Sequence, residues 1–167
     1  MGVEMSSLPH AGHEHHERIR EHIDRLPALF DMLEQRPVPP EFTPRFAKEY
    51  DFITGTLWPH VEAVETNLYP QLERLMQNRH SMAPMRREHA ELGKLIESMG
   101  LYMDRVDAGH LNPTDALALR RLIIQFYALV KTHIAEEAEY LRVLQGNLSE
   151  EEQEAIVGGL AHAAAAE

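Results

Sequence analysis

The stretch FYALVKTHIAEEAEYLRVL, residues 126–144, places a polar pair in the middle of an apolar helical face. Residues three or four positions apart share one face of an α-helix. On this face lie Phe126, Leu129, His133, Glu137, Tyr140 and Leu144. A histidine and a glutamate therefore stand where a helical protein usually buries apolar side chains. The stretch predicts a long amphipathic helix that directs His133 and Glu137 into a core.

The same helical spacing of apolar residues extends along most of the chain, and no segment alternates as a half-buried strand would. Proline, glycine and capping residues mark the ends of helices. They predict four long helices at about residues 12–35, 41–76, 84–107 and 112–146. We expect Pro59 and Pro70 to bend the second helix, because proline removes a backbone hydrogen bond. A short terminal helix is predicted from Ser149 to about residue 158.

Short connections between long helices predict one fold: an all-α, antiparallel, up-down-up-down four-helix bundle. At 167 residues the chain is the size of one domain. We interpret residues 1–167 as that domain, with the bundle core at 10–146 and a short helix and tail at 149–167.

The amino-acid composition limits the partners and cofactors that the protein can bind. A net charge of −11 argues against nucleic acid and anionic membranes as partners, because both carry negative charge. The absence of cysteine excludes disulfides, iron–sulfur clusters and thiolate zinc sites. No apolar run approaches the length of a membrane span. These features predict a soluble, cytoplasmic protein.

Four histidines repeat in the two halves of the chain. The same separation, 44 residues, lies between His16 and His60 and between His89 and His133. Apolar residues occur at the same positions after His16 and after His89. The same is true after His60 and after His133. The repeat indicates a pseudo-two-fold bundle that carries one histidine per helix at the same depth.

Buried imidazoles need partners for their nitrogens, and four protonated rings at one level would repel each other. A metal ion removes both difficulties, because neutral imidazole is a good ligand. Glu137, four residues after His133, can reach the same site. The alternative is that each histidine is a core residue bonded to carbonyls or to Glu137. The matched depth of the four favours metal.

The chain resembles the hemerythrin HHE cation-binding family over roughly residues 10–146. Four segments carry the resemblance: His16-Glu-Arg-Ile19, His60 through Pro70, Arg87-Glu-His89-Ala-Glu-Leu92 and His133-Ile-Ala-Glu-Glu137. Members hold an oxygen-bridged di-iron centre with one histidine from each helix and bridging carboxylates four residues after the second and fourth. The resemblance implies two iron ions bound by His16, His60, His89, His133 and Glu137. Manganese and zinc prefer similar ligands and remain open.

The chain departs from the family pattern at the second-helix carboxylate, because Val64 occupies that position. Glu65 is adjacent but about 100° away around the helix. A bulge near Pro59 or Pro70 would swing Glu65 inward as a replacement ligand; otherwise it is a surface charge. His10 or His13 could instead fold over the bundle mouth and complete the site, or nothing replaces the carboxylate. Met85 stands where oxygen-carrying hemerythrin has an additional histidine.

The resemblance implies a protein that binds or reacts with dioxygen, peroxide or nitric oxide. Two alternatives stay open: an oxidase or peroxidase enzyme, and a metal- or redox-sensing interaction module. The sequence leaves open whether the protein is an enzyme, which metal it holds, its physiological ligand and its oligomeric state.

Overall fold

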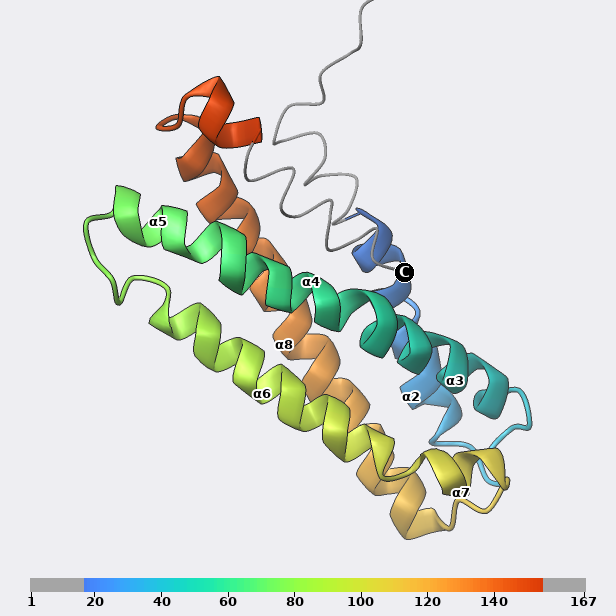
Figure 1. Ribbon diagram of the computed structural model, residues 1–167. Helices are drawn as coiled ribbons and strands as arrows, with labels where there is room; N and C mark the ends of the chain where they lie inside the picture. The colour runs from blue at the N-terminus through green and yellow to red at the C-terminus, as the bar shows by residue number, and fades with distance from the viewer. Residues whose placement is uncertain (1–16, 155–167) are drawn as a thin grey trace, which may run out of the picture.

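The computed structural model describes residues 17–154, except for the side chains of residues 144 and 145. Every element in this part of the chain is a helix, which confirms the predicted all-α class. The long helices lie side by side in Figure 1, and α8 (Pro113–Gln145) packs against segments from both halves of the chain. In residues 17–154, no helix is both long and apolar enough to cross a membrane.

The first helical stretch is interrupted, whereas a continuous helix was predicted for residues 12–35. Residues 17–23 are helical, a turn follows at 24–25, and α2 spans Leu26–Met32. Pro27 lies in the first turn of α2. A proline there has no N–H to donate to the preceding turn, so the chain restarts as a new helix. The part of the predicted helix before residue 17 lies outside the described residues.

The second predicted helix is continuous from Phe42 to Leu75 but changes type along its length. It is composed of α3 Phe42–Phe52, η1 Ile53–Leu57, α4 Trp58–Ala63, η2 Val64–Leu68 and α5 Tyr69–Leu75. Each π-helical segment, η1 and η2, ends just before a proline, Pro59 or Pro70. A proline ring clashes with the carbonyl four residues earlier in an α-helix, and a wider turn relieves that clash. The distortions predicted at these two prolines are therefore π segments.

The third predicted helix is also divided, into α6 (Ala83–Gly100) and α7 (Met103–Asp107). Tyr50 packs against Gly100 so closely that a Cβ there would lie 2.5 Å from its hydroxyl oxygen. That hydroxyl donates to the carbonyl of Ile96 in the last turn of α6. Beyond the break, α7 packs against α3 and buries Val106 completely. The break thus follows from tertiary packing at the end of α6.

Capping residues fix the start of α8 and of the terminal helix, as the sequence predicted. The Asn112 side-chain oxygen accepts hydrogen bonds from the backbone N–H groups of Thr114 and Asp115, both at 2.9 Å. Ser149 and Glu152 form a reciprocal capping box. Residues 150–154 are helical, and the rest of the predicted terminal helix lies outside the described residues.

The apolar interior has two parts, and buried polar side chains occur in the helices that join them. The larger part involves α2, α3, α6 and α8. The smaller part, here called the second cluster, consists of Val64, Leu68, Tyr69, Leu72, Met82, Met85 and Leu148. His89, His133 and Glu137 are 2–3% exposed although they are polar. Burial on this scale requires partners for these groups.

Candidate metal centre

Three helices bring four of the predicted ligands together. His60 lies on α4, His89 on α6, and His133 and Glu137 on α8. The Nε2 atoms of His89 and His133 are 2.9 Å apart. Glu137 lies between two histidines, with Oε2 3.5 Å from His133 Nε2 and Oε1 3.6 Å from His60 Nε2. A carboxylate in that position can contact two ions at once.

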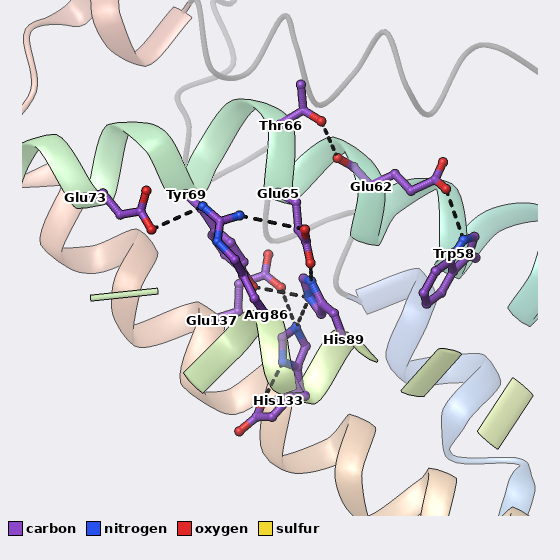
Figure 2. Close-up of polar contacts among 11 residues, drawn as sticks. Trp58, Glu62, Glu65, Thr66, Tyr69, Glu73, Arg86, His89, His133 and Glu137 are labelled. Carbon is purple, nitrogen blue, oxygen red and sulfur yellow. Dashed lines mark hydrogen bonds and ion pairs between the residues drawn. The ribbon is translucent and has the colours of Figure 1, made fainter. Parts of the chain in front are cut away.

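The outer nitrogen of each central imidazole is held by a carboxylate. Glu65 Oε1 lies 2.7 Å from His89 Nδ1, and Glu88 Oε2 lies 2.8 Å from His133 Nδ1. Figure 2 shows the contact of Glu65 with His89 and the neighbouring ring of His133. An ionised carboxylate only accepts hydrogen bonds, so both Nδ1 atoms carry a proton. In the neutral form of each ring, Nε2 is then a bare acceptor.

Two bare acceptors that face each other across 2.9 Å have no hydrogen to share. Either one ring takes up an extra proton, or a cation accepts both lone pairs. Carboxylate–histidine–metal chains of this kind are the usual arrangement around histidine ligands. The chemistry and orientation of the donors therefore fit a metal ion.

The two rings respond differently to the protein around them. Burial, followed by the proximity of His133, lowers the pKa of His89 below its ordinary value. Burial also acts to lower the pKa of His133, but hydrogen bonds and charge from Glu137 and Glu88 outweigh it and raise that pKa. Of the two rings, His133 therefore takes up an extra proton more readily than His89.

The histidine and carboxylate donor atoms approach each other two at a time and do not form a complete ligand set. Among residues 17–154, no three histidine, aspartate or glutamate side chains stand together as the ligands of a metal ion would. Small side-chain rotations or a further donor would be needed to enclose an ion. The predicted ligand His16, and the alternatives His10 and His13, lie outside the described residues.

Glu65, the proposed replacement for the missing carboxylate, does turn toward the site but contacts the outer side of His89. Its second oxygen lies 3.7 Å from Arg86 Nη1, and its side chain is 35% exposed. Val64 is fully buried in the second cluster and provides no donor atom. The π segment η2 thus brings Glu65 behind His89, a position from which it orients the ring.

Two residues at the site were not singled out from the sequence. Glu88 immediately precedes His89, and one helical step of about 100° points it to His133 on the next helix. The hydroxyl of Tyr69 lies 3.2 Å from His89 Nε2. Adjacency to a ligand histidine is the signal that could have identified Glu88. Tyr69 gave no such signal, because its approach depends on η2.

Tyr69 is fully buried and its ring stacks on His89, with ring centroids 5.4 Å apart. Arg86 covers the ring at 5.3 Å. Burial, and then the carboxylates Glu137, Glu65 and Glu88, raise the pKa of Tyr69 well above its usual value. The phenol is therefore protonated in the metal-free protein and donates to His89 Nε2. Tyr140, which the sequence placed on the same helix face as Glu137, packs half-buried against the second cluster.

Comparison with known proteins identifies the family of the chain. The family model described as "Hemerythrin HHE cation binding domain" matches residues 9–144. No curated protein and no solved structure matches the chain. The match includes every helix that contributes to the site and most of the chain's length. The protein belongs to the hemerythrin HHE cation-binding domain family, and it is a cation-binding protein of all-helical fold.

Proposed function

We propose that the protein holds two iron ions at this centre and that these ions bind or react with dioxygen, peroxide or nitric oxide. The proposal places the centre in an antiparallel up-down-up-down four-helix bundle. One observation supports it above all others. The Nε2 atoms of His89 and His133 face each other at 2.9 Å while both Nδ1 atoms are engaged by carboxylates.

In this proposal His60, His89, His133 and Glu137 are ligands, and Glu137 contacts both ions. His16 is the fourth histidine ligand by its place in the sequence repeat. Imidazole and carboxylate donors together suit iron, with manganese and zinc as competitors for the same atoms. Iron supplies an open coordination position and a change of oxidation state, which are what a diatomic or peroxide ligand requires.

The carboxylates of Glu65 and Glu88 have a different role in the proposal. Each fixes the tautomer and the orientation of one ligand ring and makes its Nε2 a better donor. Glu65 is therefore proposed as an orienting residue, rather than as the ligand expected from the sequence. Val64 and Met85, both fully buried, keep water away from the ligand faces of α4–η2 and α6.

Metal analysis of variants tests the proposal. The full-length protein is loaded with ferrous iron without oxygen, desalted, and assayed for iron per chain. We expect about two ions in the wild type and a loss of most of the iron in His89→Ala and His133→Ala. His110→Ala, an exposed residue in the connection before α8, is the matched control and should retain the wild-type content.

Ligand binding is then measured on the loaded protein by changes in its absorption spectrum on exposure to dioxygen, peroxide or nitric oxide. A wild-type protein that retains less than one iron per chain would contradict the metal centre. A loaded protein whose spectrum responds to none of the three would contradict the proposed reactivity alone.

A further inference from the structure

The ligand set of the proposed centre lacks one donor on the second helix. The residue four positions after His60 is Val64, which is apolar, fully buried and part of the second cluster. Glu65 is already engaged by His89 Nδ1 and Arg86 on the outer side of the imidazole. The described part of this helix therefore has no carboxylate on the inner side of His89. A different oxygen lies there.

The π segment η2 brings Tyr69 around to the face of Val64. The backbone N–H of Tyr69 donates to the carbonyl of Val64, a hydrogen bond that spans five residues. In an α-helix the fifth residue lies about 140° away around the axis. The wider π turn reduces this angle and brings the fifth residue nearer to the face of the first. Tyr69 thus occupies the helix face from which a carboxylate at position 64 would have extended.

The hydroxyl of Tyr69 is directed at the inner nitrogen of His89. Its oxygen lies 3.2 Å from His89 Nε2, whose other close neighbour is His133 Nε2 (Figure 2). When Nε2 donates its lone pair to a metal, it can no longer accept the phenol hydrogen bond. The side chain is fully buried, so its hydroxyl must find another partner within the site.

We propose that Tyr69 is a metal ligand, and that its phenolate oxygen takes the place of the carboxylate missing at Val64. The inference depends on the proposed metal centre and specifies its donor set. On coordination the O–H bond of Tyr69 breaks, an oxygen lone pair forms the bond to the metal, and the proton leaves to bulk water. No electron is transferred. A bound cation favours this exchange because it lowers the pKa of any oxygen that it coordinates. Tyrosinate also serves as an iron ligand in haem proteins.

The test uses the colour of the full-length protein loaded with iron and oxidised to the ferric state. A phenolate bound to ferric iron gives a broad visible charge-transfer band and resonance-enhanced ring vibrations. Iron content is measured on the same samples. Three proteins are compared: the wild type, Tyr69→Phe and Tyr140→Phe. Tyr140 is the matched control because it is a tyrosine that packs, half-buried, against the same second cluster to which the fully buried Tyr69 belongs.

We expect the band and the ring vibrations in the wild type and in Tyr140→Phe, and their loss in Tyr69→Phe at an iron content of at least one ion per chain. An iron-loaded wild type without phenolate vibrations would overturn the inference, as would a band that survives in Tyr69→Phe. Should Tyr69→Phe fail to fold, wild-type protein grown with ring-deuterated tyrosine decides the matter. The vibrations must shift if a tyrosine is bound. Failure of the wild type to retain iron would instead overturn the proposed metal centre itself.

Discussion

At the scale of single residues, the centre depends on which nitrogen of each histidine is free. Glu65 and Glu88 accept hydrogen bonds from the Nδ1–H groups of His89 and His133, which leaves both Nε2 lone pairs directed into the site. The sequence singled out the four histidines and Glu137 because helical spacing puts them on apolar faces, and the structure buries His89, His133 and Glu137 among them. The sequence did not identify the carboxylate partners, because the contact of Glu88 with His133 crosses from α6 to α8. Such contacts depend on the relative rotation of two helices, which a single helix pattern does not contain.

Removal of the Glu88 carboxylate should weaken metal binding without loss of a ligand. We expect Glu88→Ala to lower the affinity for ferrous iron by about 10–100-fold, because residues that orient histidine ligands typically contribute that much. Competition with a chromophoric chelator measures the change. Glu91→Ala is the control, because Glu91 is on the same helix but forms an exposed pair with Lys94. Equal affinities for the two variants would contradict the orienting role.

The Glu88 carboxylate should also affect how the stability of the metal-free protein depends on pH. The pKa of His133 is raised in the folded state, with Glu137 and Glu88 as the causes that outweigh burial. A raised pKa contributes stability that is fully present below the unfolded value of about 6.5 and is lost as the pH rises through the folded value. The destabilisation caused by Glu88→Ala should therefore be larger near pH 5.5 than at alkaline pH. Thermal melts of the wild type and Glu88→Ala at a series of pH values measure this destabilisation. A destabilisation that grows with pH would contradict the prediction.

At the scale of elements, the second helix shows how far local sequence signals extend. Pro59 and Pro70 predicted where the helix is distorted, and both distortions occur, as η1 and η2. The sequence did not predict that η2 would turn Tyr69 to the site. It also missed the breaks at residues 24–25 and 101–102. Pro27 carried a local signal for the first break, whereas the second depends on Tyr50 packing against Gly100 from another helix.

Pro70 should maintain the register of the site. In Pro70→Ala the ring no longer clashes with the preceding turn, so η2 can relax to an α-helix and rotate Tyr69 away. We expect the ferric protein to lose the phenolate band while its helix content, measured by circular dichroism, is kept. Pro84→Ala is the control, because Pro84 lies in the first turn of α6, where proline replaces no internal hydrogen bond. An unchanged band in Pro70→Ala would show that η2 does not depend on the proline.

The close packing of α4 on α6 provides a test of the fold that is independent of metal. A Cβ at Gly93 would lie 2.8 Å from the indole of Trp58, so Gly93→Ala forces the ring aside. We expect a loss of about 1 kcal/mol in the free energy of unfolding, the low end for overpacked sites, because the clash is with the outer edge of a half-buried ring. Fluorescence of Trp58, the only tryptophan, reports both the shift and the unfolding. Gly146→Ala, where the added atom meets open space, should be close to neutral.

At the scale of the whole molecule, a bound ion would connect three helices at one point. Its proposed ligands lie on α4, α6 and α8, beside the second cluster (Figures 1 and 2). An ion that binds the folded chain alone stabilises it by mass action, by about 2.7 kcal/mol at a hundredfold excess over the dissociation constant. Removal of iron should therefore lower the melting temperature of the wild type. The melting temperature of His133→Ala should not respond to iron, and a matching rise in that variant would indicate binding elsewhere.

The central claim is that the inner nitrogens of His89 and His133 bind one cation between them. Crystals of the iron-loaded protein, measured on both sides of the iron absorption edge, test it most directly. The account predicts an anomalous difference peak at bonding distance, about 2.1 Å, from both Nε2 atoms. It would be contradicted by a fully loaded crystal whose iron peak lies elsewhere, with the two rings still joined by a shared proton.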